Sequence, residues 1–287
     1  MVHGRSGFRL AWFENNTRVI GQPVFFKIYR EKADYVVLPE DLGVKILSLP
    51  GKKIIFNQNI YYGFDALGPN KVNDWPYLDK SVKFIMTVSL QNQRYLQFAF
   101  PNARIRRIYY GVDSEKFTYK PINQKKKIIT LLAAKAPLDS HFLYQVLSAR
   151  AGQGLNRLRS YQWCFSGRNS EGQTAKILGE TLIFVFPSTC EGFGLMPLEA
   201  MLSGAIVVAY KGGAYCEYLS RSNSFLVDSS DKLALIKIAE YIAEKFTSLS
   251  GRKELQAISQ RGYEAAKRYS LEREEKSVLE FWKEVIG

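Results

Sequence analysis

The sequence predicts an α/β fold of two Rossmann-like, doubly wound parallel-sheet lobes that face a cleft. Short apolar runs that read as buried strands alternate with amphipathic stretches that read as helices. A lysine-rich, weakly apolar segment at residues 119–127 interrupts this alternation and reads as a hinge. With 287 residues and 46% hydrophobic content, the chain can build two modest cores. We expect a first lobe over residues 1–121, a second over 122–269, and a C-terminal helix over 270–287.

In the first lobe, apolar runs bounded by turn residues predict parallel strands. The expected strands cover residues 33–40, 52–59, 82–89 and 104–117. A helix with Ser89 as its N-cap follows the third strand. The second run gives way abruptly to Asn57, Gln58 and Asn59, and such amides either cap a turn or face a ligand cleft.

The second lobe repeats the alternation of strand and helix. Its expected strands cover residues 127–133, 160–167, 181–186 and 205–210, with a short one within 223–246. Its expected helices cover residues 139–150, 170–179, 195–202, 253–269 and 271–286, and one more follows the short strand within 223–246. Ser170 and Gln173 predict a capping box at a helix start, Gly179 predicts that helix's end, and Ser270 predicts the cap of the last helix.

The most informative stretch covers residues 186–219. An apolar run enters it and stops at Pro187, as a buried parallel strand does where it meets a polar loop. Gly192 and Gly194 leave the loop backbone bare, so its N–H groups can approach a ligand. A short helix and a second apolar run follow. Two strands therefore flank a helix whose N-terminus faces the sheet edge at which open parallel sheets bind ligands.

Two carboxylates accompany that edge, Glu191 in the loop and Glu199 on the helix. Both could point into one pocket about as long as a sugar nucleotide. The alternative is a solvated loop carboxylate and a surface helix residue. The length of the pattern PSxxEGFGLxxLEAMxxG favours the pocket.

This stretch resembles the donor-binding signature of retaining, two-lobed (GT-B) glycosyltransferases of family 4, the group 1 transferases. In that family the first Glu and the Gly-Phe-Gly backbone hold the donor hexose, and the second Glu binds the nucleotide ribose. The matching positions are Glu191, Gly192, Phe193, Gly194 and Glu199. Gly212 and Gly213, after the next strand, are expected to join the donor site, and Glu217 is a less distinctive match. Elsewhere along the chain the resemblance is weak.

Family members usually carry an Arg and a Lys after the strand that opens the second lobe, where they hold the donor diphosphate. Lys135 matches the Lys, but alanines precede it, and Arg168 is the candidate that would compensate. Glu191 and Lys135 are the expected catalytic residues. The resemblance favours a UDP- or GDP-linked donor, sets the three amides at residues 57–59 on the acceptor side, and implies that the last helix packs back on the first lobe.

Cysteine and histidine usage excludes several classes of enzyme. The three cysteines have no metal-binding spacing and favour a reducing cytoplasm, and two histidines cannot supply a zinc site or a Ser-His-Asp triad with confidence. No paired-Asp motif stands at a strand end. We therefore predict no metal and no cofactor, the nucleotide sugar being a substrate. No apolar run approaches the ~18–20 residues of a membrane span, and the first ten residues lack a signal-peptide core, so we expect a cytoplasmic, soluble or peripheral protein.

The net charge of +13 predicts an anionic partner. No nucleic-acid-binding motif accompanies it, which leaves a phosphorylated ligand or an anionic membrane surface. Arg104, Arg106 and Arg107, with aromatic residues nearby, either face an anionic lipid or glycan acceptor or form a solvated strand face. The solvated face is the more ordinary interpretation.

Together these features predict a metal-independent, retaining glycosyltransferase with a glycan, lipid-linked or small-molecule acceptor. The alternatives are a catalytically silent nucleotide-sugar-binding protein or subunit, and a basic scaffold for membrane or nucleic acid. The first convincing strand begins at Ala33, so the resemblance also implies that the first lobe lacks its opening strand and helix. Such a lobe would expose sheet edge, and we expect it to make a homo- or hetero-oligomeric contact.

Overall fold

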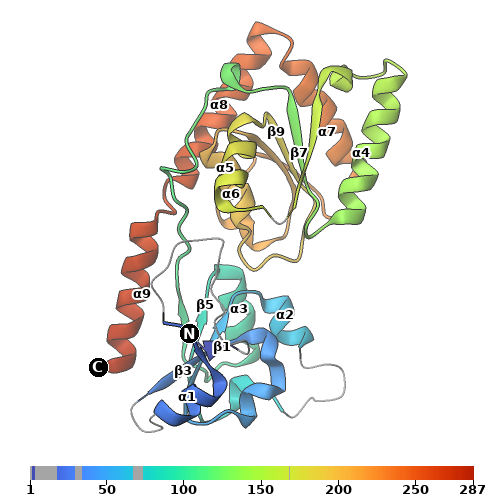
Figure 1. Cartoon of the computed structure of the whole chain (residues 1–287). Coiled ribbons are helices and arrows are strands. Elements are labelled where there is room, and N and C mark those ends of the chain that lie inside the picture. The colour runs from blue at the N-terminus through green and yellow to red at the C-terminus, as the bar shows by residue number, and fades with distance from the viewer. Residues whose placement is uncertain (1, 4–17, 30–33, 67–73, 168) are drawn as a thin grey trace. The chain divides into compact units, whose positions relative to one another are not determined.

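The computed structural model describes residues 2–3, 18–29, 34–66, 74–167 and 169–287. The chain divides into two compact units, each with its own parallel sheet (Figure 1). Unit 1 comprises residues 1–87 and 92–106, and unit 2 comprises residues 88–91 and 107–287. The lobe boundaries at residues 121 and 269 stay predictions.

Unit 1 contains a four-stranded sheet whose first three strands pair in parallel. In spatial order the strands are β3 (Tyr35–Pro39), β4 (Lys52–Asn57), β5 (Val82–Thr87) and β6 (Ile105–Arg107). Two short parallel strands, β1 (Val2–His3) and β2 (Ile20–Gly21), pair separately. The helices are α1 (Gln22–Ile28), α2 (Ile60–Asp65) and α3 (Leu90–Ala99), with 3-10 segments at Glu40–Ser48 and Pro76–Leu78. Buried Leu38, Ile55, Ile85 and Leu96 form its core.

The fourth strand is much shorter than the sequence predicts. The strand β6 covers only Ile105–Arg107, although apolar and basic residues alternate over a longer run. The chain beyond it is held by the C-terminal helix α9 (Leu271–Ile286) and the residues just before that helix. The Tyr109 N–H donates to Ser277 Oγ at 3.0 Å, the Gly111 N–H donates to Glu274 Oε2 at 2.9 Å, and Val112 forms an isolated parallel bridge with Ser270. These contacts satisfy backbone donors that a longer strand would have used in the sheet.

Unit 2 contains a five-stranded, wholly parallel sheet of the doubly wound kind. In spatial order its strands are β11 (Phe225–Val227), β10 (Ile206–Tyr210), β9 (Ile183–Phe186), β7 (Ile128–Leu132) and β8 (Gln162–Ser166). Its helices are α4 (Pro137–Gly152), α5 (Glu171–Glu180), α6 (Leu195–Leu202), α7 (Lys232–Lys245), α8 (Leu249–Ala266) and α9, with 3-10 segments at Ile122–Gln124, Arg157–Ser160 and Ala214–Glu217. Helices α4 and α7 pack together on one face, and α5 and α6 on the other (Figure 1).

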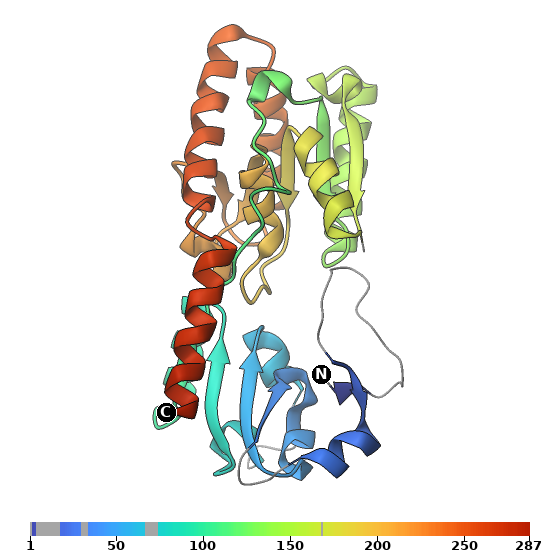
Figure 2. The same ribbon diagram turned by 60° about the vertical axis from the view of Figure 1, so that its left-hand side comes forward.

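The helix ends follow their side-chain chemistry, with two corrections. The capping box of Ser170 and Gln173 is present at α5, but Gly179 lies inside that helix, which runs on to Glu180. Helix α8 begins at Leu249, earlier than predicted, because the Ser248 side chain caps it by accepting from the Gly251 N–H. Figure 2 shows α9 following directly on α8. Across the described ranges, no helix combines the length and apolarity that a membrane crossing needs.

Lys125 lies at the C-terminal ends of two helices of unit 2. Its ammonium donates to the carbonyl oxygens of Leu178 (3.0 Å) and Gly179 (3.1 Å) in α5, and to that of Ser203 at the end of α6. Burial lowers the pKa of this ammonium to about 7, whereas the three acceptors favour its charged form. The sequence predicts a hinge at residues 119–127, and the run of lysines there does not indicate that this one is buried. Its burial is tolerated because the ammonium group donates hydrogen bonds to carbonyl oxygens at the helix ends, where those carbonyls have no partner within the helix.

Replacing Lys125 by methionine is expected to lower the free energy of unfolding by about 2 kcal/mol. A buried carbonyl that loses its donor costs ~1–3 kcal/mol, and removing a desolvated charge offsets part of that loss. Thermal melts at neutral pH should show Tm falling by roughly 5 °C. Lys126→Met is the matched control, because Lys126 is exposed and pairs with Glu180 at the surface. Equal melting temperatures for the two variants would contradict the anchoring role.

Candidate functional site

The loop after β9 carries the signature residues to the N-terminus of α6. Gly194 is the N-cap, with φ 83°, a left-handed conformation that favours glycine. No side chain caps this helix end. The N–H groups of the first turn, on Leu195 and Met196, are therefore left without a side-chain acceptor, as an anion site at a helix N-terminus requires.

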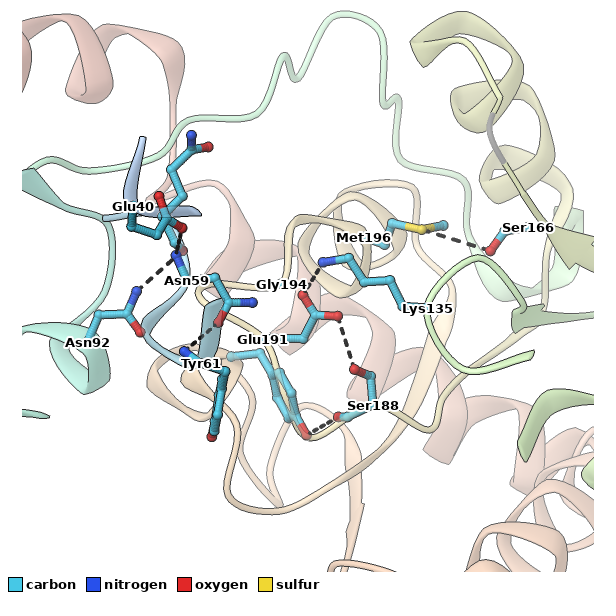
Figure 3. Close-up of polar contacts among 12 residues, drawn as sticks. Glu40, Asn59, Tyr61, Asn92, Lys135, Ser166, Ser188, Glu191, Gly194 and Met196 are labelled. Atoms are coloured by element: carbon cyan, nitrogen blue, oxygen red, sulfur yellow. Dashed lines mark hydrogen bonds and ion pairs between the residues drawn. The ribbon is translucent and has the colours of Figure 1, made fainter. Parts of the chain in front are cut away.

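Glu191 lies in that loop, and its carboxylate is held from two sides (Figure 3). Lys135 Nζ, from the segment after β7, lies 2.6 Å from Oε2, and Ser188 Oγ donates to Oε1 at 3.0 Å. Glu191 is only 3% exposed, whereas the Lys135 side chain is 48% exposed. The two residues that the sequence predicts to be catalytic are thus in direct contact. A buried carboxylate is paired here with a cation that remains open to solvent.

Ser188 is a site residue that the sequence analysis missed. Besides its hydroxyl bond to Glu191, its carbonyl oxygen accepts a hydrogen bond from the Tyr215 hydroxyl at 2.7 Å. Tyr215 is fully buried beneath the loop. A serine three residues before the glutamate, in the PSxxE pattern, is the signal that could have identified it.

Phe193 does not present its ring to a ligand. The ring is buried and packs against Tyr110, Tyr218 and Tyr269, with ring centroids 5.5–5.6 Å apart. Tyr218 is buried in the same cluster, and its hydroxyl group donates a hydrogen bond to the Gly194 carbonyl oxygen. The middle residue of Gly-Phe-Gly therefore anchors the loop to a buried aromatic cluster.

Glu199, on α6, is half-buried and has an unusual carboxylate. Its Oε2 atom is buried and has no hydrogen-bond partner among the residues that the structure describes. Burial, assisted by the charge of Glu171 at the start of α5, raises its pKa to about 7. Since α5 starts just beyond the C-terminal end of β8, this carboxylate lies near the sheet edge predicted to bind the nucleotide. An unused buried acceptor there suits a ligand hydroxyl.

The two glycines after β10 differ in the reason for their presence. Gly212 has φ 102°, a left-handed conformation that favours glycine, and its backbone is held by neighbours: its N–H donates to Cys216 Sγ at 3.3 Å, and its carbonyl oxygen accepts from Gln91 Nε2 at 3.1 Å. A Cβ on Gly213 would lie 2.0 Å from the Tyr215 ring, so this position must stay bare for packing. The Glu217 carboxylate is engaged within the protein: it accepts hydrogen bonds from the Leu90 N–H at 3.0 Å and from the Arg107 guanidinium.

In unit 1 the three amides of the predicted acceptor side have different surroundings. Asn57 is buried and donates to the Tyr77 hydroxyl at 2.9 Å, and Asn59 caps α2 by accepting from the Tyr61 N–H at 3.0 Å (Figure 3). Gln58 alone exposes its side chain. The capping alternative thus holds for Asn59, and an acceptor-binding role stays a prediction. Arg168 lies outside the described residues.

Titratable side chains in the described part of the chain do not gather as metal ligands would. No group of three or more His, Cys, Asp or Glu side chains is arranged to hold an ion within those residues. Cys190 and Cys216, which lie within the signature stretch, are exposed, and neither is in a disulfide. Metal independence remains a prediction on these observations, to be tested by chelation.

Comparisons with known proteins match this site and this fold. Residues 155–264, which include the whole loop and α6, match the family model "Glycosyl transferases group 1". A lipopolysaccharide core biosynthesis mannosyltransferase, LpcC of Rhizobium leguminosarum bv. viciae, is 48% identical over 64 residues, or 22% of this chain and 18% of its own length. An alpha-1,6-glucosyltransferase of Actinobacillus pleuropneumoniae serotype 7 is 25% identical over 239 residues, or 78% of this chain and 63% of its own.

Among solved structures, HepE of Anabaena in complex with UDP superposes with a TM-score of 0.62 at 15% identity, covering 93% of this chain and 86% of that one. The fold class predicted from the sequence is therefore confirmed as an α/β chain of the GT-B type with two parallel sheets. The chain spans less than two thirds of the length of the two curated relatives. The family match and the named relatives support an enzyme of the glycosyltransferase class.

Proposed function

We propose that the chain is a retaining, metal-independent glycosyltransferase that moves a hexose from a nucleoside diphosphate sugar to an unidentified acceptor. The observation that carries the proposal is the buried Glu191 carboxylate. It accepts a hydrogen bond from Ser188 and forms an ion pair with Lys135, and it precedes the N-terminus of α6, whose N-cap is a glycine. That arrangement falls inside the segment matching the group 1 transferases. Retention of configuration rests on the sequence resemblance.

The chemistry needs negative charge on the departing diphosphate to be stabilised as the glycosidic bond breaks. Lys135 can supply a cation, and the first N–H groups of α6 add a positive helix end, so no metal ion is required for this task. Because Lys135 is half exposed, it can bridge Glu191 and a phosphate oxygen. Glu191 stays held by Ser188 and is free to accept from hexose hydroxyls.

The nucleotide is assigned to the other carboxylate. Glu199 offers a buried oxygen without a partner among the described residues, which suits the paired hydroxyls of a ribose. We propose a UDP- or GDP-linked hexose, since HepE is described with UDP and the two relatives are named as mannosyl- and glucosyltransferases. A glycan, lipid-linked or small-molecule acceptor, a cytoplasmic location and peripheral contact with anionic membrane belong to the same proposal.

The test is a panel of UDP-, GDP- and ADP-hexoses, assayed by mass spectrometry for nucleoside diphosphate release and transfer in buffer containing EDTA. We expect turnover of one donor class with full activity under chelation, because Lys135 and helix N–H groups carry the charge. Turnover that requires added Mn²⁺ or Mg²⁺ would overturn metal independence alone. Tight donor binding without turnover across several acceptors would favour the alternative, a catalytically silent nucleotide-sugar-binding protein.

A further inference from the structure

Unit 2 has a concave site at the edge of its sheet opposite to the proposed donor site. A cavity of about 410 Å³ opens where β7 and β8 begin and where α7 gives way to α8. Its lining residues are Lys127, Arg157, Ser160, Tyr161, Ala243, Phe246, Thr247 and Arg252. The five residues of β7 separate it from Lys135 by roughly 15 Å. A ligand bound here would not overlap the donor site.

The charge of this lining is one-sided. Three cations, Lys127, Arg157 and Arg252, line the cavity, and no carboxylate does. Their partners among the described residues are weak: Lys127 Nζ lies 3.5 Å from Ser160 Oγ, and Arg252 donates to the Phe246 carbonyl at 3.3 Å. The remaining cation, Arg157, is paired with a carboxylate, but that ion pair lies in solvent.

The cavity lining also contains uncharged hydrogen-bond donors. Ser160 and Thr247 bring hydroxyl groups to the lining. Tyr161 is 7% exposed, and its buried hydroxyl has no hydrogen-bond partner in the part of the chain that the structure describes. Arg157 has its exposed carboxylate partner, but no ion pair joins Lys127 or Arg252 to a carboxylate among the described residues, so an anion that bridges the three cations would relieve their mutual repulsion. Arg and Lys donors beside hydroxyls are the groups that recognise phosphate oxygens.

We propose that this cavity, centred on Lys127, Arg157 and Arg252, binds a phosphate ester as a second anion site. Its volume is that of a small-molecule pocket, and Phe246 and Ala243 supply apolar wall for the organic part of such a ligand. The phosphate could be borne by a soluble metabolite or by a lipid headgroup, and both present the same oxygens to the three cations.

The first measurement is calorimetric titration of the whole chain with inorganic pyrophosphate. Lys127→Ala/Arg252→Ala should weaken binding roughly tenfold or more, since two charge-assisted hydrogen bonds are lost. Lys237→Gln, which removes an exposed charge from α7 away from the cavity, should bind as the unmodified protein does. All three proteins keep Lys135, so any pyrophosphate bound at the donor site contributes equally and cancels from the comparison.

Sedimentation with vesicles distinguishes the two sources. If phosphatidylglycerol vesicles, but not phosphatidylcholine vesicles, carry the protein down and the double variant does not follow, the ligand is a lipid headgroup. If vesicle binding is unchanged while pyrophosphate binding is lost, the ligand is soluble. Equal pyrophosphate affinity and equal vesicle binding for the double variant and Lys237→Gln would overturn the proposal. Thermal melts check folding, and Lys127→Gln or Arg252→Gln alone provides the comparison if the double variant is unstable.

Discussion

Replacing Glu191 by glutamine should reduce transfer by about 100-fold or more, since a single preorganised polar group at such a site typically contributes ~10²–10³ in kcat. Glutamine keeps the size of the side chain and can still accept from Ser188, but it no longer carries the charge that pairs with Lys135. UDP or GDP binding should be nearly unchanged, because Glu191 is assigned to the sugar. Steady-state turnover and calorimetric titration with the nucleoside diphosphate measure the two effects.

The neighbouring residue supplies the control. Cys190 is exposed and adjacent in the same loop, so Cys190→Ser perturbs the loop without touching the carboxylate. It should retain close to full turnover. Wild-type turnover in Glu191→Gln would refute the catalytic assignment, and a parallel loss of nucleotide binding would show that Glu191 serves the nucleotide instead.

Glu199→Gln should weaken UDP or GDP binding roughly tenfold or more, as removing a charged acceptor from a hydrogen bond costs ~1.5–3 kcal/mol. The same carboxylate should make binding by the unmodified protein depend on pH. Its pKa is raised to about 7 by burial, so at pH 6 it is mostly protonated and must lose a proton to accept two hydroxyls. Affinity should therefore rise roughly tenfold between pH 6 and pH 8.

Titrations of both proteins across this range isolate the effect. Glu199→Gln retains only the pH dependence of the nucleotide, so the difference between the two slopes belongs to the carboxylate. A carboxyl whose folded pKa lies above its unfolded pKa of 4.5 adds stability at low pH that is lost as pH rises through about 7. At pH 8 the glutamine variant should thus melt no lower than the unmodified protein. Identical slopes would mean that Glu199 does not contact the ribose.

Much of this molecule follows from local pattern. Apolar runs predicted the strands of the two larger sheets. Ser170 with Gln173, and Ser270, predicted where α5 and α9 begin. Contacts between residues that are far apart in the chain could not be predicted from local pattern. The two predicted catalytic residues are 56 positions apart in the chain, and no local rule states that Lys135 reaches Glu191.

The errors share a physical cause, which is that backbone groups found partners in distant parts of the chain. The strand predicted over residues 104–117 ends at Arg107 because α9 side chains accept the N–H groups that a sheet would have used. Lys125 belongs to a lysine-rich segment that the sequence predicts only as a hinge, yet its ammonium is buried and donates to carbonyl oxygens at the ends of two helices. Hydrophobic periodicity reflects only residues that are close in sequence. The α9 side chains and the helix-end carbonyl oxygens that form these contacts are far away in sequence.

Phe193 shows that the signature combines two different constraints. Its ring, packed against three tyrosines, holds the loop in shape before any donor arrives, so little conformational entropy need be lost on binding. Altering donor preference by design should therefore leave Phe193 and Gly194 in place and vary the polar residues around Glu191. Tyr110 and Tyr269 lie in segments far from the loop in sequence, so the shape of the loop depends on residues outside the signature as well as on those within it.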